Sequence, residues 1–271
     1  MISSSVLRKT CIMLAALSAT PAAAEPSRTG GKLLLTGGVS SVEGAAGGGL
    51  ASWAVIGGDE TEAGIGASAH GTWVALPDFD LTSFGVTLGI HDRVELSYAH
   101  QSFDTRAAGA ALGLGHGFTF HQQVFGAKLR LVGDAVYGQD SALPQISVGV
   151  QYKSADRDAI IHAVGGRQSK GTDFTLSATK LLLAHSLVLN GTVRATKANQ
   201  FGLLGFGGDR SNAYHAEFEG SAALLLSRHL ALGADPPCRA DRRLGRSRRH
   251  RDLCRPARRL SLAPDQFLRG P

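Results

Sequence analysis

The chain has little cysteine, no long apolar run and no extended helical periodicity. Its three cysteines are Cys11, Cys238 and Cys254, so residues 25–235 contain none. That absence excludes a disulfide framework and a thiolate metal site from this stretch. No run of about 18 apolar residues follows the N-terminus, which excludes a transmembrane helix there. The 271 residues, 35 of them glycine, suffice for one large β domain.

Positive charge is also scarce outside one region. The C-terminal stretch 236–271 carries 11 Arg against 3 Asp, a net charge of +8, whereas the whole chain carries +6. The remaining residues therefore have a net charge of −2, and the basic pI is a property of the tail. A nucleic-acid-binding role for the domain is not expected, since the tail also lacks interleaved aromatic residues for base stacking.

Both ends of the chain differ from its middle. Residues 1–24 have a positive start at Arg8 and Lys9, a short apolar core and small residues up to Ala24, which predicts a signal peptide cleaved before Glu25. In residues 236–271 periodicity and lysine disappear together, which favours out-of-frame translation over a disordered basic tail that binds anions. Between the leader and the first strands, residues 25–50 are rich in glycine. Lys32 precedes Leu33 and not a hydroxyl residue, so no phosphate loop is expected. We expect this segment to pack closely against other backbone inside a barrel.

The segment Ile146–Lys153 shows the pattern that dominates residues 51–235. Ile146, Val148, Val150 and Tyr152 alternate with Ser147, Gly149, Gln151 and Lys153. A strand places alternate residues on opposite faces, so this pattern predicts a ribbon with one apolar and one polar face. Comparable segments predict strands at Ala51–Gly57, Gly64–Ala75, Leu81–Ile90, Val94–Phe103, Phe118–Val132, Ala159–Val164, Phe174–Leu183, Leu187–Lys197, Ala213–Leu226 and His229–Gly233. Leu81–Ile90 and Val94–Phe103 form a candidate hairpin around His91–Arg93.

Alternation alone does not say which face meets water. The export signal, the strand lengths and the charges on the polar face favour an antiparallel transmembrane β-barrel of about 10–12 strands, incomplete at the C-terminus. Tyr98 and Tyr152 near strand ends fit an aromatic girdle. A soluble periplasmic β-barrel that binds a ligand is the alternative. In the membrane reading the lumen is lined by Glu95, Lys128, Arg130, Lys153, Arg194, Glu217 and Glu219.

Four stretches carry a family resemblance: Gly30–Gly44, Val94–Tyr98, Arg130–Tyr137 and Ala195–Gly208. Over Gly30–Asp235 the chain resembles a proteobacterial family of porin-like outer-membrane β-barrels classified as a domain of unknown function. The resemblance implies location and fold without an activity. It also implies further C-terminal strands ending in an aromatic residue, which this chain lacks.

Two constellations could carry chemistry. His215, Glu217 and Glu219 share a strand face and could hold a divalent cation, although pairing with Lys128, Arg130 or Arg194 competes with that reading. His100, Ser102 and Asp104 also share a face, as an outer-membrane hydrolase would need. That face continues Val94, Leu96 and Tyr98, which the barrel model turns to lipid.

The sequence therefore predicts an outer-membrane β-barrel that acts as a passive pore or a structural envelope protein and not as an enzyme. The alternatives are the outer-membrane hydrolase and the soluble periplasmic binding protein. Its expected partners are outer-membrane lipid and the barrel-insertion machinery. No cofactor and no nucleic acid are expected.

Overall fold

The computed structural model describes residues 40–58, 60, 62, 64–75, 79–111, 113–136, 138, 141–208, 211–227 and 230–234. It also places two short strands, β1 (Met13–Leu14) and β13 (Arg258–Leu262). Apart from these strands, the predicted leader (1–24), the first part of the glycine-rich segment (25–39) and the predicted tail (236–271) lie outside the described residues.

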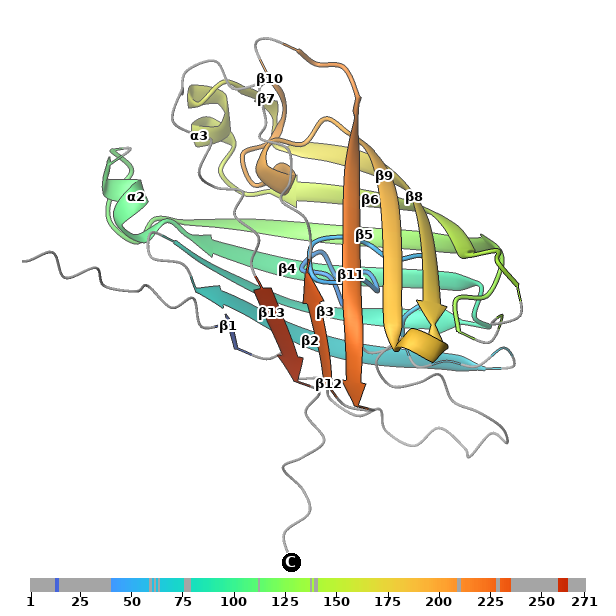
Figure 1. The fold of residues 1–271 in the computed structure, drawn as a ribbon. Coiled ribbons are helices and arrows are strands. Elements are labelled where there is room, and N and C mark those ends of the chain that lie inside the picture. The colour runs from blue at the N-terminus through green and yellow to red at the C-terminus, as the bar shows by residue number, and fades with distance from the viewer. Residues whose placement is uncertain are drawn as a thin grey trace, which may run out of the picture.

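One antiparallel sheet forms most of the described chain, as predicted. Its order is β1-β2-β3-β4-β5-β6-β8-β9-β11-β12-β13, so nearly every strand pairs with its neighbour in sequence. The long strands are β2 (Ile65–Ala75), β3 (Asp80–Ile90), β4 (Val94–Asp104), β5 (Thr119–Val132), β6 (Gln145–Ala155), β8 (Lys170–Leu182), β9 (Leu187–Thr196) and β11 (His215–Ser227), followed by the shorter β12 (Leu230–Ala234). The sheet curls into a half-barrel (Figure 1). Among the described residues, no pairing joins β1 to β13.

The two ends of the half-barrel differ. At one end, called the loop end, the strands are joined through residues 105–118, 156–169 and 197–214. At the other, called the turn end, His91–Arg93 closes the predicted β3–β4 hairpin, and a one-turn 3₁₀ helix, η1 (Leu183–His185), joins β8 to β9. His91 and Asp92 have positive φ (51° and 49°), the left-handed backbone of a tight hairpin turn.

Helix is scarce, and the described α-helices lie at the loop end (Figure 1). The two described α-helices, α2 (Arg106–Ala111) and α3 (Asp158–Ala163), have six residues each, and no described helix is long and apolar enough to cross a bilayer. The strand predicted over Ala159–Val164 was wrong, because this run forms α3 and buries Ile161. Beside it, β7 (Gly166–Gln168) pairs with β10 (Phe206–Gly208) in a small second sheet.

The two faces of the large sheet alternate as the sequence predicts. In β6, Val148, Val150 and Tyr152 are exposed on the convex outer face, whereas Gln151 and Lys153 are buried on the concave inner face. The register extends this division across the sheet, since Val150 pairs with Ala127 and Phe174, which face the same side.

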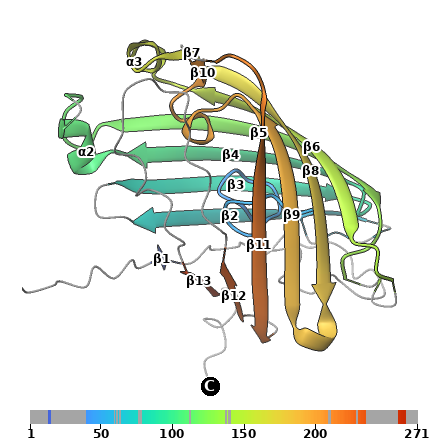
Figure 2. The ribbon, with the colours of Figure 1, turned by 45° about the horizontal axis from the view of Figure 1, so that its top comes forward.

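Residues 40–58, called the inner segment, lie within the curl of the sheet (Figure 2). Most of their side chains are buried, Trp53 and Ile56 among them. The segment folds on itself through two β-bridges, Ser40–Ala46 and Gly47–Ser52. Within the described part of the glycine-rich segment, residues 40–50 pack closely against the half-barrel sheet, and a Cβ on Gly44 would lie 3.2 Å from the Tyr98 carbonyl oxygen. The strand expected over Ala51–Gly57 was wrong, because these residues continue the inner segment. They hydrogen-bond mainly to side chains of the surrounding large sheet, which is called the wall.

Candidate functional site

A buried cluster of charges joins the inner segment to the wall. Glu43 belongs to the inner segment, and Lys153, Asp173, Arg194 and Glu219 project from β6, β8, β9 and β11. The wall residues converge because their strands are consecutive neighbours and because each lies on the inward row of its strand. Arg194 has Thr175 and Glu217 as its Cα partners on either side.

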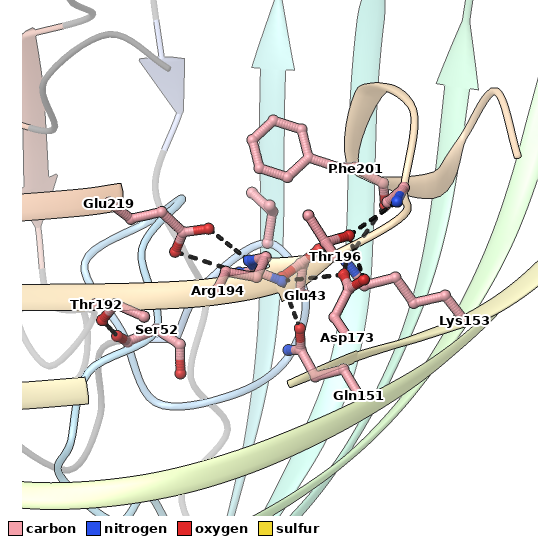
Figure 3. Close-up of polar contacts among 12 residues, drawn as sticks. Glu43, Ser52, Gln151, Lys153, Asp173, Thr192, Arg194, Thr196, Phe201 and Glu219 are labelled. Carbon is pink, nitrogen blue, oxygen red and sulfur yellow. Dashed lines mark hydrogen bonds and ion pairs between the residues drawn. The ribbon is translucent and has the colours of Figure 1, made fainter. Parts of the chain in front are cut away.

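The contacts form one continuous network (Figure 3). The ammonium group of Lys153 forms ion pairs with Glu43 and with Asp173, the latter at 2.7 Å between Nζ and Oδ2. Arg194 Nη1 lies 2.8 Å from Glu43 Oε2, and its Nε lies 2.5 Å from Glu219 Oε1. Asp173 also accepts a hydrogen bond from the Thr196 hydroxyl.

This network is almost completely removed from solvent. The side chains of Lys153 and Asp173 are 0% exposed and that of Arg194 is 2% exposed. Buried charges are costly unless they are paired and hydrogen-bonded, and loss of one partner leaves the other uncompensated. The single acid of the inner segment, Glu43, therefore anchors that segment to two wall cations.

A second ion pair holds the inner segment at two points of its fold. Glu95 accepts hydrogen bonds from the backbone N–H groups of Ala46 (3.2 Å) and Gly57 (2.8 Å). Lys128 pairs with Glu95 at 3.0 Å and donates to the carbonyl oxygens of Ala46 and Val55. The pair thus fixes the two arms of the inner segment side by side against β4 and β5.

Neutral side chains of the wall also form hydrogen bonds with the inner segment. Thr192 and Ser177 donate to the carbonyl oxygen of Ser52 at 2.6 and 3.2 Å. On the other side, Ser83 and Gln101 both donate to the Val42 carbonyl at 2.7 Å. Thr87 and Gln145 likewise donate to the carbonyl oxygens of Gly44 and Ala54. Thr179 Oγ1 accepts a hydrogen bond from the backbone N–H of Ala54, and Ser221 Oγ accepts one from the indole N–H of Trp53. The polar row of the sheet is therefore paired with the backbone of the inner segment over most of its length.

The connection between β9 and β11 also reaches into this site. The carbonyl oxygen of Phe201 accepts hydrogen bonds from Gln122 (3.1 Å) and Lys153 (3.4 Å). Gln200, Phe201 and Gly202 have φ of 50°, 60° and 99°, so three successive residues adopt left-handed backbone. Such strain persists only where surrounding contacts fix it, and here the wall supplies them. Lys153 thereby contacts the inner segment, the wall and a loop-end connection at once.

The seven predicted lumen residues all lie on the inner side of the sheet, but four of them contact the inner segment. One group of contacts to the inner segment comes from Glu95 and Lys128, and another comes from Lys153 and Arg194; these two groups are called the clamps. Glu219 pairs with Arg194. Glu217 is half-buried on the same row of β11. Arg130 lies at the turn end, where it forms ion pairs with Asp92 and Asp134. Sequence reasoning missed Glu43 and Asp173. Asp173 fell in a predicted loop, and no local pattern marks Glu43.

The side chains of the weak metal candidate form contacts with other residues. His215 and Glu219 do share the inward row of β11, but Glu219 binds Arg194 and His215 Nε2 lies 3.2 Å from Ser211 Oγ. Within the part of the chain that the structure describes, no three His, Cys, Asp or Glu side chains are grouped so that they could hold a metal ion.

The hydrolase candidate is rearranged. His100, Ser102 and Asp104 share the outer face as predicted, but Ser102 Oγ lies 2.9 Å from Nδ1 of His121 on β5 and not beside a base on its own strand. The His100 and His121 rings stack at 5.5 Å between centroids. Asp104 accepts a hydrogen bond from the backbone N–H of Arg106, so it does not orient the histidine.

Fold and site together define a protein built from a curled antiparallel sheet that seats a buried inner segment. The chain belongs to a family of proteins of unknown function (DUF3034), whose family model matches residues 36–249. The predicted membership of a domain of unknown function is thus confirmed. No curated protein and no solved structure matches the chain.

Proposed function

We propose that this chain is an outer-membrane β-barrel protein whose interior is closed by the inner segment, so that it serves as a structural envelope protein rather than a standing open pore. The observation that supports membrane placement is the inverted chemistry of the sheet. Its outer face is apolar and exposed, and its inner face carries the charges.

The exposed apolar side chains of the outer face support membrane placement. Exposed large hydrophobic side chains occur on β2, β3, β4, β5, β6, β8, β9 and β11 of the large sheet, with Phe84 62% and Phe218 79% exposed. Soluble monomers rarely expose contiguous apolar patches above a few hundred Å². Strands of 11 residues, such as β4 and β6, also match the roughly 9–11 residues of a tilted transmembrane strand.

Aromatic residues occur at one level of the outer face. Tyr98, Phe125 and Tyr152 are consecutive cross-strand partners on β4, β5 and β6, and the Tyr98 and Phe125 rings lie 5.0 Å apart. Toward the turn end the outer face of these three strands is apolar. Toward the loop end it becomes polar, beginning with His100 and Gln123. Such a boundary is typical of an aromatic girdle at a membrane interface.

The interior favours a closed state. Lys128, Lys153 and Arg194 would attract ions in a wet lumen, but each is buried against the inner segment. An ion would have to displace residues 40–58 and break both clamps in order to pass. The predicted export signal and the barrel-insertion machinery complete this proposal as the route to the membrane.

Fractionation of cells that express the protein tests the location. We expect the protein in the outer-membrane fraction, resistant to extraction by salt and alkali and released by detergent. Recovery in the periplasmic extract without detergent would favour the soluble binding barrel and overturn the proposal.

Planar-bilayer recording tests the closed interior. We expect membranes that contain the inserted protein to show no steady conductance steps at neutral pH. Stable, long-lived open steps from the unmodified protein would contradict a closed envelope protein and favour the passive pore.

A second candidate function rests on the contact between Ser102 and His121. A serine hydroxyl 2.9 Å from an imidazole nitrogen is the minimal arrangement for nucleophilic catalysis. An outer-membrane hydrolase would be labelled by a fluorophosphonate probe, and the Ser102→Ala and His121→Ala variants would each lose the label. Absence of labelling in the unmodified protein would exclude this candidate.

A further inference from the structure

Two lysines lie at the loop end of the outer face, beyond the aromatic residues of β8 and β11. Lys170 begins β8 and is exposed, and Lys197 follows the last residue of β9. Neither forms an ion pair with a described residue. Lys197 Nζ lies 4.7 Å from the centroid of the Tyr214 ring. Lys170 and Lys197 are called the cationic rim.

Below the rim, polarity falls in steps along the strands. The Tyr214 hydroxyl donates to the Thr172 carbonyl at 3.2 Å, and its ring lies 6.0 Å from Phe174. Phe174 is followed on the same face by Leu176. The outer surface therefore passes from ammonium groups through an amphipathic ring to aromatic and aliphatic side chains. Lysine and tyrosine side chains adopt this arrangement where an apolar phase meets a charged one.

We propose that the cationic rim binds the phosphate groups of anionic lipids in the leaflet at the loop end. The inference rests on the proposed membrane location and adds a partner to it. Lys170 and Lys197 carry positive charge at the height where headgroup phosphates would lie if Phe174 and Leu176 contact acyl chains. Anionic lipid surfaces attract each such cation individually, so their effects combine.

A lipid is favoured over free phosphate because the apolar part of the surface is continuous with the charged part. A free anion would contact only two flexible ammonium groups, with no buried donor to hold it. A lipid would contact the ammonium groups with its phosphate and the rings of Tyr214 and Phe174 with its chains. The expected partner is therefore amphipathic and singly or multiply anionic.

The test uses the full-length protein in nanodiscs of phosphatidylcholine into which phosphatidylglycerol is titrated. Retention of fluorescent phosphatidylglycerol by the protein is measured for the unmodified chain, for K170Q/K197Q and for the charge-preserving control K170R/K197R. We expect the glutamine variant to bind about 30-fold more weakly. The arginine variant should bind like the unmodified protein. Inorganic phosphate should not compete at millimolar concentration.

Three outcomes overturn the inference in distinguishable ways. If all variants insert into the nanodiscs but bind phosphatidylglycerol equally, the rim has no headgroup role and the membrane location stands. If inorganic phosphate competes fully, the partner is a free anion. If no variant enters either bilayer, the membrane location fails and the lipid site fails with it.

Discussion

The inner and outer faces of the same strands follow opposite rules. On the inner face, lysine, arginine and carboxylate side chains are buried and paired with one another or with backbone groups. On the outer face, Phe84, Leu176 and Phe218 are exposed. A soluble sheet protein hides its apolar face and wets its polar face. Here the apolar side chains are exposed on the outside. Contact with a lipid phase would remove the free-energy cost of exposing them to water.

Inside the curl of the sheet, the inner segment takes the place that water would have in an open lumen. In an open lumen, water would solvate the polar row of each strand. Here the backbone of residues 40–58 provides the hydrogen-bond partners, and Glu43 provides the counter-charge for Lys153 and Arg194. The interior is thus stabilised by specific pairing, whereas the exterior depends on its surroundings.

The largest expected effect is the loss of Arg194. Replacing it by alanine leaves Glu43 and Asp173 with one cation, Lys153, and removes the Arg194 ion pair of Glu219, so we expect the free energy of unfolding to fall by about 3–5 kcal/mol. Urea unfolding in detergent micelles measures the change. The control is Arg167→Ala at an exposed position of β7, which should change stability by less than about 0.5 kcal/mol. Equal effects of the two variants would contradict a structural role for the buried cluster.

A charge in the middle of the outer face should cost nearly as much, but only in a membrane. We expect Leu176→Arg to destabilise the bilayer-inserted protein by about 2–4 kcal/mol, because arginine meets acyl chains there. The matched control is Gln123→Arg, beyond the aromatic residues on the same face, with a cost below about 1 kcal/mol. Reversible unfolding from lipid vesicles supplies both values. A neutral outcome for Leu176→Arg would favour a water-facing sheet.

The close approach of the inner segment to the wall predicts a smaller effect. Gly44 has φ of 93°, and a Cβ there would lie 3.1 Å from the Ala99 Cβ and 3.2 Å from the Tyr98 carbonyl oxygen. Gly44→Ala should therefore cost about 1–3 kcal/mol in thermal or urea unfolding.

Gly191 supplies the control for that substitution. It lies exposed in β9, and a Cβ there would meet nothing within 4 Å. Gly191→Ala should stabilise the protein by about 0.5–1 kcal/mol, because alanine loses less backbone entropy on folding. Destabilisation by both substitutions to the same degree would show that packing against the wall is not what Gly44 provides.

The sheet was largely predictable because two-residue periodicity acts locally. Val94–Phe103 and Leu187–Lys197 alternate so regularly that the strands, and the residues that share each face, follow from the sequence. Short apolar runs carry no such signal. Ala159–Val164 became a helix and Ala51–Gly57 became part of the inner segment, since six or seven apolar residues suit a helix, a strand or buried coil equally.

The site was predictable only in part. Alternation placed Lys128, Lys153 and Arg194 on the polar face, but it could not supply their partners. Glu43 is 110 residues from Lys153 in sequence, so their pairing depends on the fold of the whole sheet. A buried polar face needs partners for its charges, but no pattern around Glu43 in the sequence identifies it as that partner.

The two tryptophans allow the two faces to be compared by fluorescence and without a measurement of stability. Trp53 is 3% exposed in the inner segment, where its indole N–H donates to Ser221 Oγ at 2.7 Å, whereas Trp73 is 41% exposed on the outer face of β2. Each single-tryptophan variant, Trp53→Phe or Trp73→Phe, therefore reports on one face alone. In vesicles of lipids brominated along the acyl chain, fluorescence should be strongly quenched when only Trp73 remains and little changed when only Trp53 remains. Quenching of neither variant, with acrylamide quenching Trp73 from water, would place the outer face in solvent and reverse the assignment of the two faces.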